Sequence, residues 1–230
     1  MPPGWPPFAD GRFTFEVQPG LRVSGQLDLP ASARACYVLA HGAGAGMDHP
    51  FMSAAANELG ELGIATLRYQ FPYMERRSRR PDPPPLCHAT VRAAIGEAAQ
   101  RAGSLPLFAG GRSFGGRMTS QAQALEPLAG VRGLAFLGFP LHPAGQPSDA
   151  RAAHLSQVHV PMLFLQGMND ALAERARMQL LARHLGERAT LHLVADADHS
   201  FHVPARSGRR DQEVRRELLQ VLAAWMDTLL

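Results

Sequence analysis

The sequence predicts an α/β fold in which a mostly parallel sheet forms the middle layer of a three-layer sandwich. Two observations support this prediction. Short apolar segments typical of buried strands alternate with helix-like stretches along most of the 230 residues. Such alternation is typical of a parallel sheet covered by helices on both faces. In addition, two segments of alternating polarity near the start of the chain predict an antiparallel hairpin at one edge of the sheet.

The predicted elements follow in order along the chain. The hairpin comprises residues 13–17 and 21–29, which flank the turn signal Pro19-Gly20. The later strands are expected at residues 36–40, 64–69, 105–109, 131–139, 160–166 and 190–195. Helices are expected at residues 52–62, 87–101, 116–125, 172–185 and 211–229. The connection over residues 140–159 has room for a loop and a short helix, so we expect little or no lid over the site.

Composition and length are those of one globular domain, with 46% hydrophobic and 19% charged residues. We expect residues 1–12 to form an extended lead-in and residues 13–230 a single domain. The first residues lack the basic start and apolar core of a secretory signal, and no apolar run is long enough to span a membrane. The cysteines, Cys36 and Cys87, fit no metal or redox motif and are expected to be reduced thiols. These features predict a cytoplasmic protein without membrane attachment.

The formal net charge is +3, and all 23 basic residues are arginines. The densest basic run, residues 76–80, leads into a proline-rich segment and has no interleaved aromatic side chains. This pattern predicts a solvated loop and no nucleic-acid partner. A weaker alternative is that the run attracts anionic substrates.

The most informative segment covers residues 107–116, where an apolar strand leads into Gly111-Arg112-Ser113-Phe114-Gly115 and then into a helix. A G-x-S-x-G turn between a strand and a helix is typical of a nucleophile elbow, which holds the serine in a strained conformation with its hydroxyl exposed. Ser113 is therefore the candidate nucleophile. The alternative is a glycine-rich loop that contains a serine by chance.

A serine hydroxyl needs a histidine base, and the histidine needs an acid that orients its ring. Asp170 stands just after the strand expected at residues 160–166, and His199 lies in the loop after the last strand. Both are therefore expected at the same edge of the sheet as Ser113. An aspartate before a helix is also a common cap, which is the alternative role of Asp170. The rival acids and bases are Asp196, Asp198, His154, His192 and His202.

An oxyanion hole is predicted at His41-Gly42-Ala43-Gly44, where a strand ends in a glycine-rich turn. We assign its donors to the backbone N–H groups of Ala43 and Phe114. A phosphate-binding loop is the alternative, but the Lys-Ser/Thr pair of a P-loop and the G-x-G-x-x-G spacing are both missing. His41 is expected to form structural hydrogen bonds. No metal or organic cofactor is expected.

Several residues near predicted strand ends are candidates for substrate contacts. They are Met47, Arg68, Phe71, Tyr73, Arg112, Phe139 and Met168. For the apolar residues the alternative is core packing. Arg68, Arg112 and Arg117, the last two flanking the elbow, could hold an acidic substrate, and the alternative for each is an ion pair that fixes a loop.

These segments together resemble the α/β-hydrolase superfamily over nearly the whole chain. Within it, the chain is similar to a dienelactone-hydrolase-like bacterial branch related to the hydrolase-like domain of a subunit of an animal histone acetyltransferase complex. The motifs that carry the resemblance lie at residues 41–44, 68–73, 111–117, 139–143, 166–170 and 198–201. The resemblance implies the fold and a Ser113–Asp170–His199 triad. Dienelactone hydrolases proper use a cysteine nucleophile, so Ser113 argues against dienelactone chemistry.

From these observations we expect a serine esterase-like hydrolase that cleaves a small carboxylic ester or thioester through an acyl-enzyme on Ser113. We expect a monomer or homodimer whose partner is the small-molecule substrate. Peptidase activity is disfavoured because no further domain that would select peptides is evident. The alternative from another class is a non-catalytic binding or interaction module with the same fold.

Overall fold

The computed structural model describes residues 11–230, in which eight strands form one sheet with the order β1-β2-β4-β3-β5-β6-β7-β8. The strands are β1 (Arg12–Gln18), β2 (Leu21–Asp28), β3 (Ala35–Ala40), β4 (Ile64–Tyr69), β5 (Leu107–Arg112), β6 (Val131–Leu137), β7 (Met162–Gly167) and β8 (Ala189–Val194). The hairpin β1–β2 is antiparallel and pairs with β4, while all pairs from β4 to β8 are parallel. The predicted α/β architecture is therefore confirmed.

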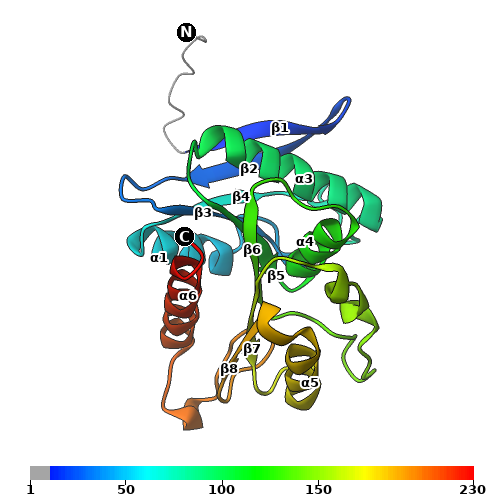
Figure 1. The fold of residues 1–230 in the computed structure, drawn as a ribbon, viewed down its shortest axis with the longest axis vertical. Coiled ribbons are helices and arrows are strands. Elements are labelled where there is room, and N and C mark those ends of the chain that lie inside the picture. Colours follow the sequence, from blue (N-terminus) through cyan, green and yellow to red (C-terminus); the bar gives the residue numbers. More distant parts are fainter. Residues whose placement is uncertain (1–10) are drawn as a thin grey trace.

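Helices cover both faces of the sheet, as Figure 1 shows. One face carries α1 (Pro50–Glu61) and α6 (Asp211–Asp227). The other carries α3 (Pro84–Arg101), α4 (Phe114–Leu125) and α5 (Arg175–Leu185). Because the central strands are buried on both sides, β3, β4 and β7 are fully buried along their whole length. The layers of the predicted three-layer sandwich are all present.

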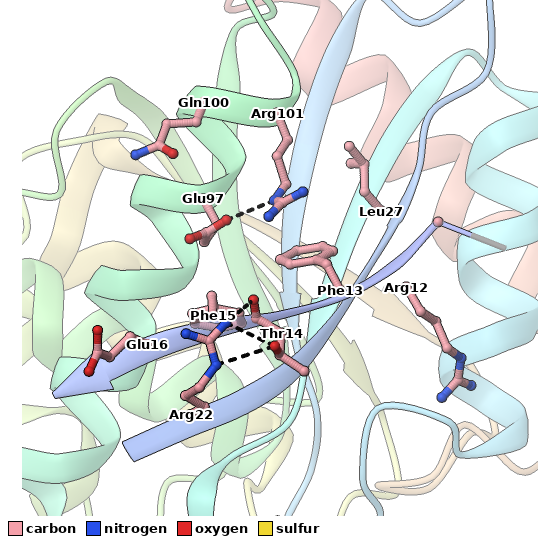
Figure 2. Close-up of a pocket in the computed structure, with 11 residues that line it drawn as sticks. Arg12, Phe13, Thr14, Phe15, Glu16, Arg22, Leu27, Glu97, Gln100 and Arg101 are labelled. Carbon is pink, nitrogen blue, oxygen red and sulfur yellow. Dashed lines mark hydrogen bonds and ion pairs between the residues drawn. The ribbon is translucent and has the colours of Figure 1, made fainter. Parts of the chain in front are cut away.

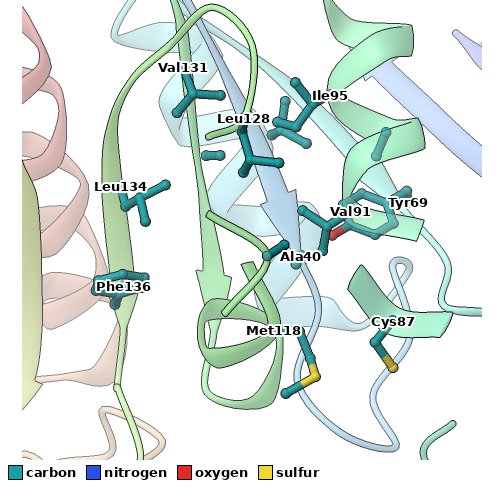
Figure 3. Packing of buried hydrophobic residues seen from close by; sticks show 14 of the residues in the cluster. Ala40, Tyr69, Cys87, Val91, Ile95, Met118, Leu128, Val131, Leu134 and Phe136 are labelled. Carbon is teal, nitrogen blue, oxygen red and sulfur yellow. The ribbon is translucent and has the colours of Figure 1, made fainter. Parts of the chain in front are cut away.

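The larger of the two cores lies beneath α3 and α4, where apolar side chains of the helices interdigitate with those of the sheet (Figure 3). The cluster includes Val91 and Ile95 from α3, Met118 from α4, and Leu134 and Phe136 from β6. Cys87 belongs to the same cluster, and Cys36 lies on the same face of β3. Both cysteines are free and buried, as expected for reduced thiols, and burial raises the pKa of each to about 12.

The structure shifts some predicted boundaries. Strand β5 continues to Arg112, so the elbow serine follows the strand directly. Helix α5 begins at Arg175 rather than at residue 172, because residues 171–174 form a turn after β7. A one-turn helix, α2 (Pro72–Glu75), was not predicted. The lead-in predicted for residues 1–12 lies outside the described residues except for Gly11 and Arg12, and Arg12 already belongs to β1.

Residues 140–159 form a loop followed by a short 3₁₀ helix, η1 (Ala150–Gln157), so no lid domain interrupts the fold. The basic run is a solvated loop as predicted, with Arg77, Arg79 and Arg80 exposed. Within residues 11–230, no helix is both long and apolar enough to cross a membrane.

A cavity of about 700 Å³ lies between β1 and the C-terminal end of α3 (Figure 2). Phe13 forms part of its lining, and the guanidinium of Arg101 lies 3.7 Å from the centroid of the Phe13 ring. Arg101 also pairs with Glu97 of the same helix. None of the residues that line this cavity is a candidate site residue. The cavity is therefore separate from the predicted active site.

Candidate active site

Ser113 occupies the sharp turn between β5 and α4. Its backbone angles, φ 49° and ψ −112°, are unusual for a residue with a side chain, as the elbow motif predicts. The turn is held from beneath because the amide of Ser113 donates to the carbonyl oxygen of Leu137 on the neighbouring strand β6, at 3.1 Å. The backbone strain is therefore maintained by the sheet.

The glycines on either side of the elbow are required by close packing against β3. A Cβ on Gly111 would lie 2.3 Å from the carbonyl oxygen of Ala40. A Cβ on Gly115 would lie 2.6 Å from the carbonyl oxygens of both Ala40 and His41. Only glycine lets the elbow approach the end of β3 so closely, and this approach brings Ser113 beside the turn that follows β3.

The structure brings Ser113, His199 and Asp170 into one hydrogen-bonded line. Nε2 of His199 lies 2.8 Å from Oγ of Ser113, and Nδ1 of His199 lies 2.7 Å from Oδ2 of Asp170. Since a carboxylate only accepts hydrogen bonds, Nδ1 carries the ring proton and Nε2 is left to accept the proton of the serine hydroxyl. This is the geometry in which a histidine acts as a general base toward a serine.

Asp170 is held in place by two further donors. The amide of Leu172 donates to Oδ1 of Asp170 at 2.7 Å, and Nε2 of Gln166 donates to Oδ2. The side-chain oxygen of Gln166 in turn accepts the amide of Phe139 at 2.9 Å. Asp170 thus both stabilises the turn after β7 and contacts His199. Sequence reasoning missed Gln166, although a buried glutamine that ends an otherwise apolar strand was a usable signal.

The loop with His199 reaches Asp170 because Gly167 has no side chain. A Cβ on Gly167 would lie 2.4 Å from the carbonyl oxygens of both Ala197 and Asp198. The two segments are also bonded directly, since the amide of Asn169 donates to the carbonyl oxygen of Ala197 at 2.9 Å. This contact fixes the separation of acid and base.

The rival acids have other partners. Asp198 accepts the amides of Ser200 and His202 at 2.7 and 2.9 Å, so it stabilises the turn around His199. Asp196 is exposed, and its carbonyl oxygen accepts the side-chain amide of Asn169. Neither carboxylate contacts the ring of His199.

The rival histidines likewise contact residues other than Ser113. His202 pairs with Asp211 at 2.9 Å, and His192 pairs with Glu217 at 2.8 Å. His154 lies 2.7 Å from the hydroxyl of Ser120. The geometry therefore selects His199 among the histidines named from the sequence.

The turn after β3 lies beside the elbow. Nε2 of His41 accepts the amide of Phe71 at 3.1 Å, so Nδ1 carries the proton and donates to the carbonyl oxygen of Gly42 at 2.7 Å. Burial lowers the pKa of His41 to about 4, which keeps the ring neutral. His41 therefore shapes the turn through hydrogen bonds, as expected.

The two predicted oxyanion donors stand on this turn and on the elbow. Ala43 lies in the exposed part of the turn. Phe114 is the first residue of α4, so its amide has no acceptor within the helix. The amide of the next residue in the turn, Gly44, donates to the hydroxyl of Tyr73 at 3.2 Å, which ties the turn to α2.

An aromatic cluster supports this turn from below. The ring of Phe114 packs edge-on against Phe71 and Tyr73, with centroids 5.5 and 6.3 Å apart. The ring of His41 meets Phe71 in the same way at 5.0 Å. These contacts fix the two backbone segments that carry the predicted oxyanion donors.

The structure corrects several predicted substrate contacts. Met47, Phe71, Tyr73 and Phe139 are each no more than 2% exposed, because they pack in the interior beneath the site. Their role is core packing, which was the alternative. Arg68 is also buried, and its guanidinium contacts Asp28 at 3.0 Å and the carbonyl oxygen of Met47 at 3.0 Å. Arg68 therefore fixes a loop, which was the alternative role.

Two of the predicted contacts, Arg112 and Met168, remain partly exposed. The guanidinium of Arg112 lies 4.4 Å from the centroid of the Phe51 ring. Burial lowers the pKa of Arg112, although the nearby charge of Asp198 opposes this effect. Both residues stay candidates for substrate contacts. Within residues 11–230, no group of three or more histidine, cysteine, aspartate or glutamate side chains is arranged to hold a metal ion.

A mostly parallel sheet, with a strained serine after one strand and an acid and a histidine after two later strands, defines the α/β-hydrolase fold. Comparison with protein families agrees, because residues 33–227 match the family described as Alpha/beta hydrolase domain. The chain therefore belongs to this family.

Solved structures with the same fold cover almost the entire chain. A serine hydrolase homologue from Coxiella burnetii is 19% identical, with a TM-score of 0.73 over 92% of this chain and 96% of that chain. A serine hydrolase without a lid from Xanthomonas campestris is 21% identical, with a TM-score of 0.73 over 97% and 98%. A dienelactone hydrolase from Anabaena variabilis is 20% identical, with a TM-score of 0.73 over 96% and 99%. At these identities the likeness concerns the fold.

Proposed function

We propose that this protein is a serine hydrolase that cleaves small carboxylic esters or thioesters through an acyl-enzyme on Ser113. The observation that carries the proposal is the hydrogen-bonded line from Ser113 through His199 to Asp170, with the serine held in a strained turn. The names of the similar structures, serine hydrolases and a dienelactone hydrolase, support the same class.

In the first half-reaction, Oγ of Ser113 attacks the carbonyl carbon of the substrate while Nε2 of His199 takes the hydroxyl proton. The carbonyl oxygen becomes an oxyanion, which accepts hydrogen bonds from the amides of Ala43 and Phe114. When the tetrahedral intermediate collapses, the bond to the leaving oxygen or sulfur breaks and His199 gives its proton to the leaving group. Asp170 stays ionised and stabilises the imidazolium that forms between these steps.

In the second half-reaction, water attacks the acyl carbon and gives a proton to Nε2 of His199. The oxyanion forms again on the same two amides. Its collapse breaks the bond to Oγ of Ser113, which recovers the proton from His199, and the carboxylic acid leaves. Each oxyanion donor of this kind typically contributes about 10²- to 10³-fold to the rate.

The exposed position of the turn with Ala43 and the short connection over residues 140–159 favour a small substrate that enters from solvent. Ser113 in place of a cysteine favours ordinary ester or thioester hydrolysis over dienelactone chemistry. The assembly as a monomer or homodimer, the cytoplasmic location and the relation to the animal acetyltransferase subunit stay predictions from the sequence.

The test is the intact mass of the protein after treatment with a fluorophosphonate probe, run beside Ser113→Ala. We expect one adduct on the wild type and none on the variant, because the probe reacts only with an activated serine. A panel of short-chain para-nitrophenyl esters and matching thioesters then defines the substrate class. A folded wild type that forms no adduct would instead support the alternative, a non-catalytic binding module.

A further inference from the structure

Arg117 lies one turn into α4, beside the candidate active site. Its amide donates to the carbonyl oxygen of Ser113 at 3.1 Å. Because the Cα–Cβ bonds of a helix tilt toward its N-terminus, the side chain is directed back toward the elbow. Its guanidinium carbon lies 5.8 Å from the centroid of the Phe114 ring. A positive charge therefore lies next to the residue that we assign as an oxyanion donor.

This charge has no counter-ion within residues 11–230. Arg117 takes part in no ion pair, and its Nε is buried without a hydrogen-bond partner. The nearby thiol of Cys87 stays protonated, since burial raises its pKa to about 12. Burial and the charge of Arg151 lower the pKa of Arg117, which shows that its charged form is unfavourable in this environment.

Arg151 brings a second positive charge to the same place. It stands on η1, which packs against α4 through the contact of 2.7 Å between His154 and Ser120. Residues three apart in a 3₁₀ helix lie on one face, so Arg151 shares the face of His154. Arg117 precedes Ser120 by three residues on α4. The charge of Arg151 acts on the guanidinium of Arg117, so the two arginines lie near one another at this interface.

The other ionisable groups at this interface do not neutralise the pair. Burial and the charge of Arg117 lower the pKa of His154 to about 4, so the ring is uncharged at neutral pH. His88 of α3 also contributes no negative charge, and its Nε2 lies 3.2 Å from the side-chain oxygen of Gln121. By contrast, the guanidinium groups of Arg215 and Arg68 have carboxylate partners, Glu58 and Asp28.

We propose that Arg117 and Arg151 bind a free carboxylate of the substrate, so that the molecule cleaved at Ser113 is an anionic ester or thioester such as a half-ester of a dicarboxylic acid. The guanidinium fork matches the two oxygens of a carboxylate, and a bound carboxylate would supply the counter-charge that residues 11–230 lack here. This inference rests on the proposed function, and it names the substrate class of the same site.

The kinetic test compares two esters that differ only in charge. They are the para-nitrophenyl half-ester of glutarate and the same compound with its free carboxylate capped as a methyl ester. We expect the wild type to have a higher kcat/KM for the anionic ester, and Arg117→Gln to lower the ratio of the two values about 10- to 100-fold. Arg151→Gln should lower the ratio in the same direction. Arg216→Ala, which removes an exposed arginine on α6, should leave the ratio at the wild-type value.

A binding test does not depend on turnover. Calorimetry with Ser113→Ala should show glutarate binding that weakens with added salt and is lost in Ser113→Ala/Arg117→Gln. Inorganic phosphate serves as the second ligand. Binding of phosphate without binding of glutarate would overturn the assignment to a carboxylate.

The outcomes separate this inference from the proposed function. Wild-type protein that forms the fluorophosphonate adduct and cleaves both esters with equal kcat/KM would overturn the carboxylate site and leave the hydrolase proposal intact. Protein that forms no adduct and cleaves neither ester would overturn the hydrolase proposal. Glutarate binding that depends on Arg117 would then still support an anion site, and its absence would overturn that site too.

Discussion

The carboxylate of Asp170 accepts hydrogen bonds from the ring of His199, the side chain of Gln166 and the amide of Leu172. Its side chain is fully buried, whereas that of His199 is 21% exposed. The acid is therefore fixed by the protein, and the base stays accessible to a substrate. This difference allows a direct test of which aspartate orients the histidine.

Asp170→Asn should lower kcat by about 10³- to 10⁴-fold, because an amide in this position no longer fixes the proton on Nδ1 of His199. Asp198→Asn should cost less than about tenfold, since an asparagine oxygen still accepts the amides of Ser200 and His202. Steady-state kinetics with one short ester, run on both variants, gives the comparison. If Asp198→Asn has the larger effect, the assignment of the acid is wrong.

His41 makes the stability of the fold depend on pH. Burial lowers its pKa from 6.5 to about 4 in the folded state. Between these two values the unfolded chain binds the extra proton and the folded chain does not, so stability falls as the pH drops from 6.5 to 4. The full effect is about 3 kcal/mol of unfolding free energy.

Urea unfolding of the wild type and His41→Gln at pH 7.5, 6.0 and 5.0 measures this contribution. Glutamine retains an acceptor for the amide of Phe71 and a donor for the carbonyl oxygen of Gly42. The variant should therefore lose less stability than the wild type over this range. Equal losses in the two proteins would show that His41 does not titrate in this way.

The role of a single residue was predictable where a local sequence pattern indicates both the residue type and its position after a strand. Ser113, Asp170 and His199 each follow a recognisable strand, and the structure brings the three together. For Arg68 the sequence left a substrate contact and an ion pair both open, because its partner Asp28 lies on β2 and only the pairing of β2 with β4 brings the two together. Gln166 was missed for a similar reason, since its contacts to Phe139 and Asp170 depend on the tertiary fold.

At the scale of elements, the position of the histidine loop depends on how closely it packs against the end of β7. Gly167→Ala would put a methyl group 2.4 Å from two carbonyl oxygens of that loop, so the loop must move away. We expect kcat/KM to fall at least 100-fold, since a displacement of about 1 Å at a catalytic group has this effect.

The matched control is Gly60→Ala in α1, where an added Cβ meets no atom within 4 Å. This change should raise the free energy of unfolding by about 0.5 to 1 kcal/mol and leave kcat/KM unchanged. Ester kinetics and urea unfolding on both variants make the comparison. A Gly167→Ala protein with normal activity would show that the loop adjusts without moving His199.

The ends of elements were less predictable than their existence. The apolar pattern favoured a helix from residue 172, but the turn at residues 171–174 lets the amide of Leu172 reach Asp170 and delays α5 to Arg175. Helix α2 is a single turn that begins at Pro72, and four residues are too few to show a helical period.

At the scale of the whole molecule, the site lies where the chain reverses its direction across the sheet. From β3 the chain passes through α1 to β4 on one side, and then returns through α3 to β5 on the other side of β3. The connections after β3 and β5 therefore lead to helices on opposite faces of the sheet, α1 and α4, and α/β proteins commonly bind ligands at such a position. The sequence predicted a parallel sheet but not this strand order, because the order depends on which face each helix covers.

The absence of a lid domain from residues 140–159 leads to the last prediction. The 3₁₀ helix in this connection is anchored to the body of the protein, because Ala152 and Leu155 are buried and His154 contacts Ser120. Because this connection forms no cover that must be displaced, the site should need no oil–water interface for activity. Initial rates with tributyrin, measured across its solubility limit, should approach a plateau with no upward jump. An abrupt rise above that limit would show that some part of the chain closes the site in solution and opens at the interface.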